Sequence, residues 1–486
     1  MGKLVLALTV AGVLVGAAAA ASAETVRVTP VTWDGRTVDG APLNEPGRVE
    51  SGPEDRDALI VTLYQQGPAQ VAERRTAGLR RGEQALRLLG VPASLQADTL
   101  MVVGEGSPRV ARTRLRQGQL TPERLLAAHQ GREITLVRDA DAGDTVERTV
   151  RVLAVEGDRA VVQGDAGVET LLPGSPWRPV FQELPPSLSA TPALDLVLNT
   201  DLPGRQRLDF SYLADGLDWQ VGYVMTVSAD TQAMDLDAWA TLRNRTGTPF
   251  SDADVRLVAG ASADATARPE QLASRALDDQ VGDTEAVADQ HRFRLQSPVT
   301  LEAGDEQQVR FLGAEDVALT REYRMRGGVG FGRQGRGSFQ PVTVHLTFVN
   351  DEPALGQPLP GGRVRVYQLD SDGEPVLAGQ DRLRPTPTGE EAEITIGAAF
   401  DLTAERRQTR FRRLDERTEE QGWEVRLRNA GEVDREVTVV ETLPGDWTML
   451  EESVDHTRPE AGMARWTLDV PAGGEATLNF TAEIRR

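Results

Sequence analysis

An aromatic-rich segment places two carboxylates next to a tryptophan, a combination that glycoside hydrolysis uses. Asp215 and Asp218 closely precede Trp219, and glycosidases act with two carboxyl groups beside the scissile bond. However, Asp215-Gly216 is a turn signature, and Trp219 and Tyr223 face the same side of a strand because their spacing is even. We therefore predict that this motif packs a core. A carbohydrate-active hydrolase using acidic residues near Trp219 is the alternative.

The run from Gly330 to Gly335 spells G-x-G-x-x-G. That motif binds a pyrophosphate when a strand precedes it and a helix follows it, because the phosphates contact the helix N-terminus. Here the alternating segment 338–349 follows, which is typical of a strand. The spacing therefore does not indicate a nucleotide site.

The same segment is a candidate binding loop. Glycine dominates between Arg326 and Gly337, so we expect a flexible loop, and loops on rigid β scaffolds often carry binding residues. A disordered hairpin end without a role is the alternative. The candidate binding residues are Arg326, Phe331, Arg333, Arg336 and Phe339.

Other catalytic and metal-binding patterns are missing from the sequence. It has no G-x-S-x-G elbow, no H-E-x-x-H motif and no clustered histidines. The segment 370–374 imitates the start of a calcium loop but lacks the glutamate that closes such a loop, so a hairpin turn is the better interpretation. We predict no catalytic residues, no metal and no cofactor. The histidines, which we expect to be isolated, are His129, His291, His345 and His456.

The acidic balance of the chain disfavours nucleic acid as a partner. The formal net charge is −21, from 53 basic and 74 acidic residues. Every basic residue after Lys3 is arginine, so removal of the first 23 residues leaves 53 − 1 = 52 basic residues and a net charge of −22. Such a surface repels phosphates. We favour a salty habitat and a GC-rich genome as the cause, over an acidic face built for a cationic partner.

The first residues predict export. Lys3 is followed by an apolar run over 4–21, and residues 21–23 (Ala-Ser-Ala) form a small-residue cleavage pattern. We therefore predict a signal peptide over residues 1–23, with an uncleaved anchor as the alternative. No later segment has the apolar length that a spanning helix needs, and the absence of cysteine excludes disulfides. We expect a periplasmic or secreted protein.

Hydrophobic periodicity predicts a mainly β protein. Short strands recur through an N-terminal β region, residues 24–132, with one helix near 121–130 that Thr121 caps. Within this region, residues 82–89 fit either a strand or a helical turn. Closely spaced turns then predict a small five-stranded barrel-like domain over 133–182.

The longest part of the chain, residues 193–486, predicts one or two antiparallel β-sandwich units. An acidic loop interrupts it at 261–290. A short repeat supports two units, because T-L-R-N ending at Asn244 and R-L-R-N ending at Asn429 each lead into a turn and a new strand. In both, the asparagine at the strand end offers a side-chain turn.

Several motifs, in order from Pro192 to Ile484, resemble a bacterial exported family called domain of unknown function 4139. They are the segments 213–223, 244–247, 255–260, 397–402, 425–429, 441–447 and 466–473. The stretch 63–92 is similar to the N-terminal β region of that family. The resemblance implies a β-rich exported protein with no established catalytic residues. Its signature residues, which we expect to be structural, are Tyr212, Gly216, Trp219, Tyr223, Asn244, Gly247 and Trp447.

Together these features favour a non-enzymatic, periplasmic module of the cell envelope that binds a protein or a polysaccharide. The alternatives are the hydrolase described above and a structural spacer between envelope components. We expect neither a nucleic-acid partner nor a transmembrane segment after signal cleavage.

Overall fold

The computed structural model consists almost entirely of strands, which confirms the mainly β fold class. It describes residues 48–118, 120–139, 144–185, 188, 190–228, 232–260, 284–287, 290–334 and 337–486. The expected signal peptide, the chain up to residue 47 and most of the expected acidic loop (261–283 and 288–289) lie outside the described residues. No helix among the described residues is long and apolar enough to cross a membrane.

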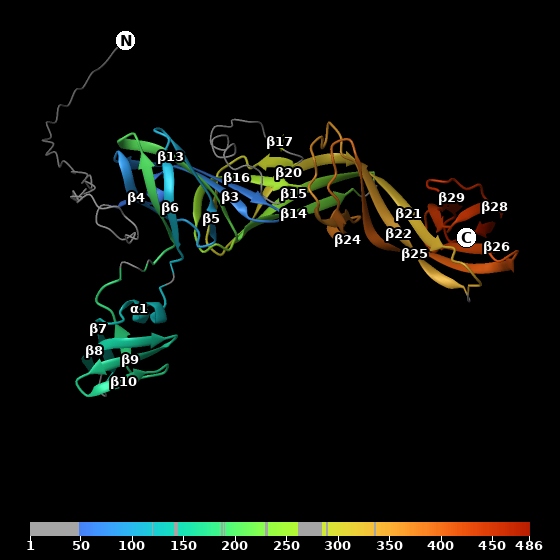
Figure 1. Cartoon of the computed structure of the whole chain (residues 1–486). Coiled ribbons are helices and arrows are strands. Elements are labelled where there is room, and N and C mark those ends of the chain that lie inside the picture. Colours follow the sequence, from blue (N-terminus) through green and yellow to red (C-terminus); the bar gives the residue numbers. More distant parts are fainter. Residues whose placement is uncertain are drawn as a thin grey trace, which may run out of the picture. The chain divides into compact units, whose positions relative to one another are not determined.

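Two sheets combine strands from before residue 117 with strands from after residue 192 (Figure 1). Sheet 1 contains, in order, β1 (Val49–Ser51), β4 (Gly82–Leu89), β12 (Ala193–Thr200) and β6 (Arg109–Arg116). Sheet 2 contains β17 (Thr284–Val287), β18 (Gln290–Arg294), β16 (Phe250–Ala259), β2 (Arg56–Tyr64), β3 (Ala69–Leu79), β13 (Gly204–Ala214) and β5 (Leu95–Gly104). Here β12 lies between β4 and β6, and β13 lies between β3 and β5. The N-terminal β region therefore shares its sheets and its core with the later chain. Residues 82–89 form a strand.

Sheet 3 packs into the same hydrophobic core as sheets 1 and 2. Its strands are β20 (Glu306–Ala318), β15 (Ala233–Asn244), β14 (Leu217–Val227), β23 (Gly362–Leu369) and β24 (Pro375–Leu383). The short β19 (Val299–Leu301) pairs with β16 of sheet 2. The segment 370–374 is the turn between β23 and β24, where the Asp370 carboxylate accepts hydrogen bonds from the backbone N–H groups of Asp372 and Glu374, both at 2.9 Å.

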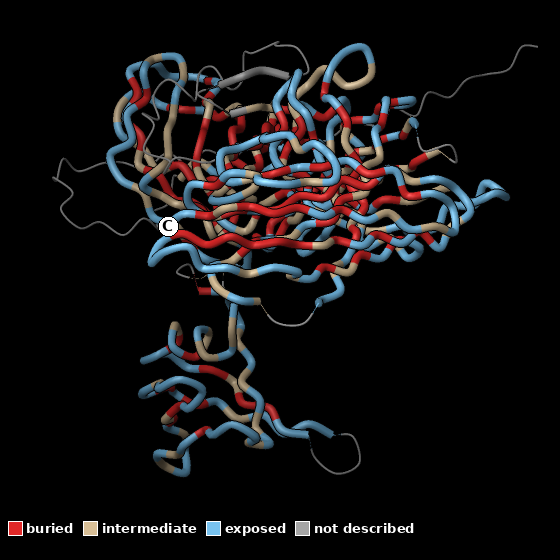
Figure 2. The backbone as a smooth tube through the Cα atoms, turned by 90° about the vertical axis from the view of Figure 1, so that its right-hand side faces the viewer, coloured by how far each residue is buried: buried red, intermediate tan, exposed pale blue. Residues whose placement is uncertain are grey.

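Sheet 4 encloses a second core that contains Trp423 and Trp466. Its order is β28 (Asp446–Glu452), β30 (Glu475–Arg485), β26 (Thr418–Asn429), β25 (Glu391–Arg413), β22 (Ser338–Val349), β21 (Thr320–Gly328), β27 (Arg435–Thr442) and β29 (Met463–Val470). The 23-residue β25 joins the two cores, because Ile394 packs in the first and Leu402 in the second. Figure 2 shows buried residues, in red, along the central strands of the sheets.

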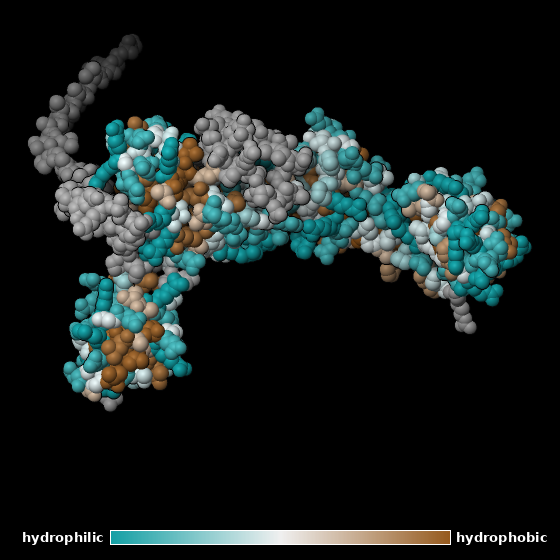
Figure 3. All heavy atoms as spheres, in the orientation of Figure 1, coloured by the Kyte–Doolittle hydropathy of each residue, from teal (hydrophilic) through white to brown (hydrophobic). Residues whose placement is uncertain are grey.

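The chain between β6 and β12, two strands of sheet 1, forms a five-stranded sheet with its own core. Sheet 5 contains β10 (Gly167–Leu171), β9 (Arg159–Gly164), β8 (Thr145–Glu156), β7 (Glu133–Asp139) and β11 (Arg178–Val180). Helix α1 (Pro122–Ala128) begins as predicted, since the Thr121 hydroxyl oxygen accepts a hydrogen bond from the Arg124 N–H at 3.3 Å. Its Leu126 packs into the core of this sheet. Figure 3 shows hydrophobic residues, in brown, gathered on this part of the chain.

Strand direction differs in part from the expected antiparallel arrangement. Among the strands that the structure describes, four pairs are parallel: β1–β4, β2–β16, β14–β23 and β21–β27. In each, the two strands are far apart in the chain, and parallel pairing requires such long connections. Sequence periodicity reports the faces of a strand rather than its partner, so it did not reveal these pairs.

Candidate functional site

One face of sheet 4 combines exposed aromatic side chains with arginines. In β22, Phe339 and Pro341 are exposed whereas Val342 is buried, because successive residues of a strand face opposite sides. Cross-strand partners share a face: Phe339 lies opposite Glu405, which lies opposite Arg426. We call this surface the outer face; it comprises Arg326, Phe339, Pro341, Thr403, Glu405, Arg407, Arg426 and Arg428 from β21, β22, β25 and β26.

A bulge interrupts β25 at the edge of this face. Pro341 pairs with Thr403 and Thr343 pairs with Ala398, so residues 399–402 of β25 lie opposite a single residue of β22. The extra residues of β25 therefore form a β-bulge that interrupts the hydrogen bonds between the two strands.

The bulge carries a second exposed phenylalanine. Phe400 is 97% exposed and Phe339 is 80% exposed, although phenylalanine is among the residues most often buried. The Asp401 carbonyl accepts a hydrogen bond from the Ala430 N–H at 2.8 Å, which fixes the bulge to the turn after β26. Phe400 lies in the family motif 397–402 but was not predicted to be a binding residue. The sequence signal for the bulge was Gly397, which lies just before it. Gly397 has a φ of +133°, a backbone conformation that favours glycine.

The outer face carries more positive than negative charge, unlike the chain as a whole. Together with the neighbouring Glu424 and Glu475 it presents four arginines and three carboxylates: Arg326, Arg407, Arg426, Arg428, Glu405, Glu424 and Glu475. Glu424 lies 2.9 Å from Arg407 and 3.4 Å from Arg426. Because a guanidinium has five N–H donors, both arginines keep donors for a partner. On a chain with a net charge of −21, this is a local surface suited to carboxylates.

Two of the predicted loop residues lie on strands. Arg326 belongs to β21 and Phe339 to β22, and both are part of the outer face. The strand that follows the G-x-G-x-x-G run agrees with the prediction that no nucleotide site is present there.

The other predicted residues belong to the loop between β21 and β22. Phe331 and Arg333 are exposed, and the Phe331 ring centre lies 4.3 Å from the Arg486 guanidinium carbon. This pair therefore belongs to the loop and not to the strands, and Arg336 lies outside the described residues.

The backbone of this loop is tied to sheet 4. The Gly332 N–H donates to the Glu419 carboxylate at 2.7 Å, and the Gln334 N–H donates to the Gln408 side-chain oxygen at 2.8 Å. Both acceptors come from the paired strands β25 and β26. These bonds give the loop a specific path across the end of the sheet.

A buried ion pair lies beneath the start of the loop. Arg406 donates to both oxygens of Glu441, at 2.6 and 3.0 Å, and to the Gly328 carbonyl at 3.0 Å. Its guanidinium carbon lies 3.4 Å from the Trp423 ring centre. A side chain at Gly327 would meet the Glu441 carboxylate at 2.3 Å, so the pair also explains a glycine there.

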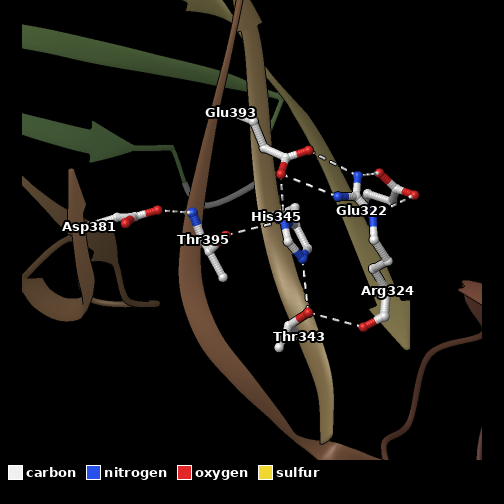
Figure 4. Close-up of polar contacts among 7 residues, drawn as sticks. All are labelled: Glu322, Arg324, Thr343, His345, Asp381, Glu393 and Thr395. Carbon is white, nitrogen blue, oxygen red and sulfur yellow. Dashed lines mark hydrogen bonds and ion pairs between the residues drawn. The ribbon is translucent and has the colours of Figure 1, made fainter. Parts of the chain in front are cut away.

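A polar network surrounds His345 (Figure 4). The imidazole Nε2 lies 2.8 Å from the Thr343 hydroxyl, and Nδ1 lies 3.1 Å from the Glu393 carboxylate. Arg324 pairs with Glu393 at 3.0 Å and also with Glu322. The network joins β21, β22 and β25, so His345 is not isolated, contrary to the prediction. The partners come from distant parts of the chain and left no local signal.

The network does not have the geometry of a nucleophilic site. The Thr343 hydroxyl donates its hydrogen to the Arg324 carbonyl at 3.0 Å, so that proton is not directed at the imidazole. Burial, followed by the positive charge of Arg324, lowers the pKa of His345 from its ordinary value. The imidazole contacts Glu393 at 3.1 Å, so it connects β22 with β25.

Two other histidines also have partners. His456 lies 2.9 Å from the Glu452 carboxylate, and His129 contacts the Leu125 carbonyl at 2.8 Å. The prediction of isolated histidines is therefore wrong for these positions as well, because strand pairing and helix geometry supply polar partners that the sequence pattern did not indicate.

The residues that suggested a hydrolase do not form a sugar platform. Trp219 is fully buried, its Nε1 donates to the Val258 carbonyl at 3.1 Å, and its ring meets Phe311 edge-on at 5.9 Å. Asp218 faces the other side of β14, where it pairs with Arg243 at 3.3 Å. The carboxylate and the indole are thus on opposite faces, and Trp219 cannot stack on a ligand.

The remaining signature residues lie in the cores or in turns. Gly216 and Gly247 have φ values of +90° and +75°, which glycine adopts at little cost. The buried members are Tyr212, Tyr223, Asn244 and Trp447.

These strands and turns define a strand-rich protein whose distinctive motifs build cores and fix strand ends. Residues 208–485 match the family model described as Domain of unknown function (DUF4139), so the chain belongs to that family. The outer face and the His345 network both lie within the matched residues. A comparison with curated proteins gave no match.

Proposed function

We propose that this protein is a non-enzymatic module of the cell envelope that binds a partner protein through the outer face. The observation that supports this proposal most directly is the exposure of Phe339 and Phe400 on a rigid sheet among arginines. A periplasmic location is part of the proposal and rests on the signal peptide expected at residues 1–23.

Residue types on the outer face favour a protein over a polysaccharide. Aromatic residues and arginine are enriched at protein interfaces and dominate their binding energy. Phenylalanine lacks the polar group that tyrosine and tryptophan present beside their rings, so it offers a sugar hydroxyl no hydrogen bond. The excess of arginine on this face selects a partner surface rich in carboxylates.

Rigidity of the face also favours binding. Phe339 extends from a paired strand, and the Phe400 bulge is held to the turn after β26 by the Asp401–Ala430 hydrogen bond. A preorganised surface loses little conformational entropy when it binds.

Affinity purification tests the proposal with matched variants. The tagged full chain is expressed in its native host, and proteins retained from the envelope fraction are compared with those retained by Phe339→Ser/Phe400→Ser. We expect a discrete protein to be lost from the double variant. It should be kept by Val376→Ser/Leu377→Ser, which removes two half-exposed apolar side chains from β24.

Each other result contradicts the proposal. Equal retention by both double variants would show that the outer face does not bind. Retention of a glycan without protein would favour the polysaccharide alternative, and retention of nothing by the wild type would favour the structural spacer.

A further inference from the structure

A cavity of about 620 Å³ lies where sheets 1 and 2 meet. It is lined by residues from four segments, 53–59, 89–90, 191–192 and 247–252, and it shares no residue with the outer face. Its volume is in the range of small-molecule sites. The last segment follows the Asn244 turn, which packs on the N-terminal strands because the Thr248 hydroxyl donates to the Val91 carbonyl at 3.2 Å.

The lining is mostly apolar, with charge in two places. The apolar side chains are Pro53, Ala58, Leu59, Leu89, Pro192 and Pro249, and the uncharged polar ones are Thr191, Thr248 and Ser251. Two exposed carboxylates, Asp57 and Asp252, and the guanidinium of Arg56 also line the cavity. Apolar walls around a few polar groups are typical of sites for organic ligands.

Arg56 belongs to a buried cluster with excess positive charge. Its Nε lies 2.8 Å from the Glu73 carboxylate, and Arg75 lies 2.9 Å from the same carboxylate. The Arg56 side chain is 7% exposed, and those of Glu73 and Arg75 are fully buried. Within the described chain neither arginine forms another ion pair, so two guanidinium groups share one carboxylate. A buried, uncompensated charge is unfavourable.

Arg56, which lines the cavity, makes one short hydrogen bond and one long one. Its Nε is used by Glu73, whereas Nη2 reaches the Gly90 carbonyl only at 3.5 Å, beyond the usual length of a good hydrogen bond. Gly90 itself lines the cavity. A ligand carboxylate at this point would satisfy the guanidinium donors and neutralise the cluster.

We propose that this cavity binds an organic ligand through a carboxylate that pairs with Arg56. A singly charged carboxylate fits better than a phosphate, because Asp57 and Asp252 repel a second negative charge. Two sources present this chemistry at the required size: the C-terminus of a peptide and a uronic acid residue of a polysaccharide.

Isothermal titration calorimetry on the full chain separates these sources. The probes are N-acetyl-trialanine and methyl galacturonoside, which each have a single carboxyl group, together with the C-terminal amide of the first and the methyl ester of the second. We expect heat from one acid, with at least tenfold weaker binding of its neutral counterpart. The acid that binds identifies the source.

Variants test the role of Arg56. Arg56→Gln should weaken binding of that acid at least tenfold. Arg74→Gln is the matched control, because Arg74 pairs with Asp209 at 2.7 Å and does not line the cavity. Ser251→Trp places a large side chain in the cavity at an exposed position of its lining and should also abolish binding. This variant tests the proposal even if Arg56→Gln does not fold. Absence of heat with all four probes, equal heat from an acid and its neutral form, or unchanged affinity in Ser251→Trp would each overturn it.

Discussion

The carboxamides of Asn244 and Asn429 make the same three hydrogen bonds. Each side-chain nitrogen donates to the carbonyl four residues further on, Thr248 or Val433, at 2.8 Å in both cases. Each also donates to the carbonyl of a residue more than 40 positions later, Leu301 at 2.9 Å or Val470 at 3.1 Å. The oxygen accepts from the N–H two residues ahead, at 3.1 or 3.0 Å. The short repeat in the sequence therefore marks equivalent turns in two sheets.

Loss of either carboxamide should destabilise the protein. Asn429→Ala removes three hydrogen bonds, and Asn244→Ala removes four, because its Oδ1 also accepts from the Thr246 hydroxyl at 2.8 Å. We therefore expect losses of about 3–4 kcal/mol at roughly 1 kcal/mol per bond. Urea denaturation followed by circular dichroism measures the change. Asn199→Ala on β12, where the side chain is exposed, should have little effect. A loss as small as that of the control would show that the turns do not depend on these asparagines.

Trp219 and Asp218 should differ in their effects on stability. Trp219→Ala empties a core position and should cost about 3–5 kcal/mol. Asp218→Asn breaks partly exposed ion pairs, which are worth about 0–1 kcal/mol. Thermal denaturation distinguishes them. Hydrolysis of an envelope glycan that disappears in Asp218→Asn would contradict this assignment and restore the hydrolase.

His345 should make stability depend on pH. Since the folded pKa is below the ordinary 6.5, the unfolded chain binds a proton that the folded chain does not, and the free energy of unfolding falls as pH drops from 7 through 6.5. Although burial opposes it, hydrogen bonding from Arg324 lowers the pKa of Glu393 from 4.5, so its contribution is lost only at lower pH. The pH range in which His345 affects stability therefore lies above the range in which Glu393 does.

Comparison with His345→Asn isolates the imidazole. Denaturation in urea at pH 7.5 and 5.5 should show a smaller decrease for the variant than for the wild type. An equal decrease in both proteins would exclude His345 as the source.

Substitutions of Arg406 and Glu441 should have non-additive effects on stability, because the two side chains form a buried ion pair. Arg406→Met leaves a buried carboxylate without its partner, which costs about 3–5 kcal/mol. Arg406→Met/Glu441→Leu removes both charges and should be more stable than the single variant. Arg151→Met, which breaks an exposed pair with Glu133 at 3.4 Å, is the control and should behave as wild type. A double variant less stable than Arg406→Met would contradict the desolvation argument.

Much of the fold followed from the sequence because strands, turns and the helix are encoded locally. The cap at Thr121, the turn at 370–374 and the asparagine repeat all depend on neighbouring residues, and each is present. Pairing between distant strands was not predictable, since the alternation in β12 is equally compatible with many partners. The shared sheets of the N-terminal region therefore became visible only in three dimensions.

The candidate site was predictable only in part, for the same reason. Arg326 and Phe339 were predicted as binding residues because the segment around them is rich in glycine, yet both lie on strands. Phe400 depends on a register shift between β22 and β25, and the charge on the outer face depends on which arginines are cross-strand neighbours. The cavity at Arg56 joins segments nearly 200 residues apart, which no local pattern reports.

Photo-crosslinking in living cells tests directly whether the outer face binds a protein. A photoreactive amino acid replaces Phe339 or Phe400, and Val168 on β10, which is 63% exposed, serves as the control position. We expect a discrete protein adduct at 339 and 400 but not at 168. Arg407→Glu should weaken this adduct, because we propose that the partner surface is acidic. Adducts that are the same at all three positions, or absent from 339 and 400, would contradict a binding surface on the outer face.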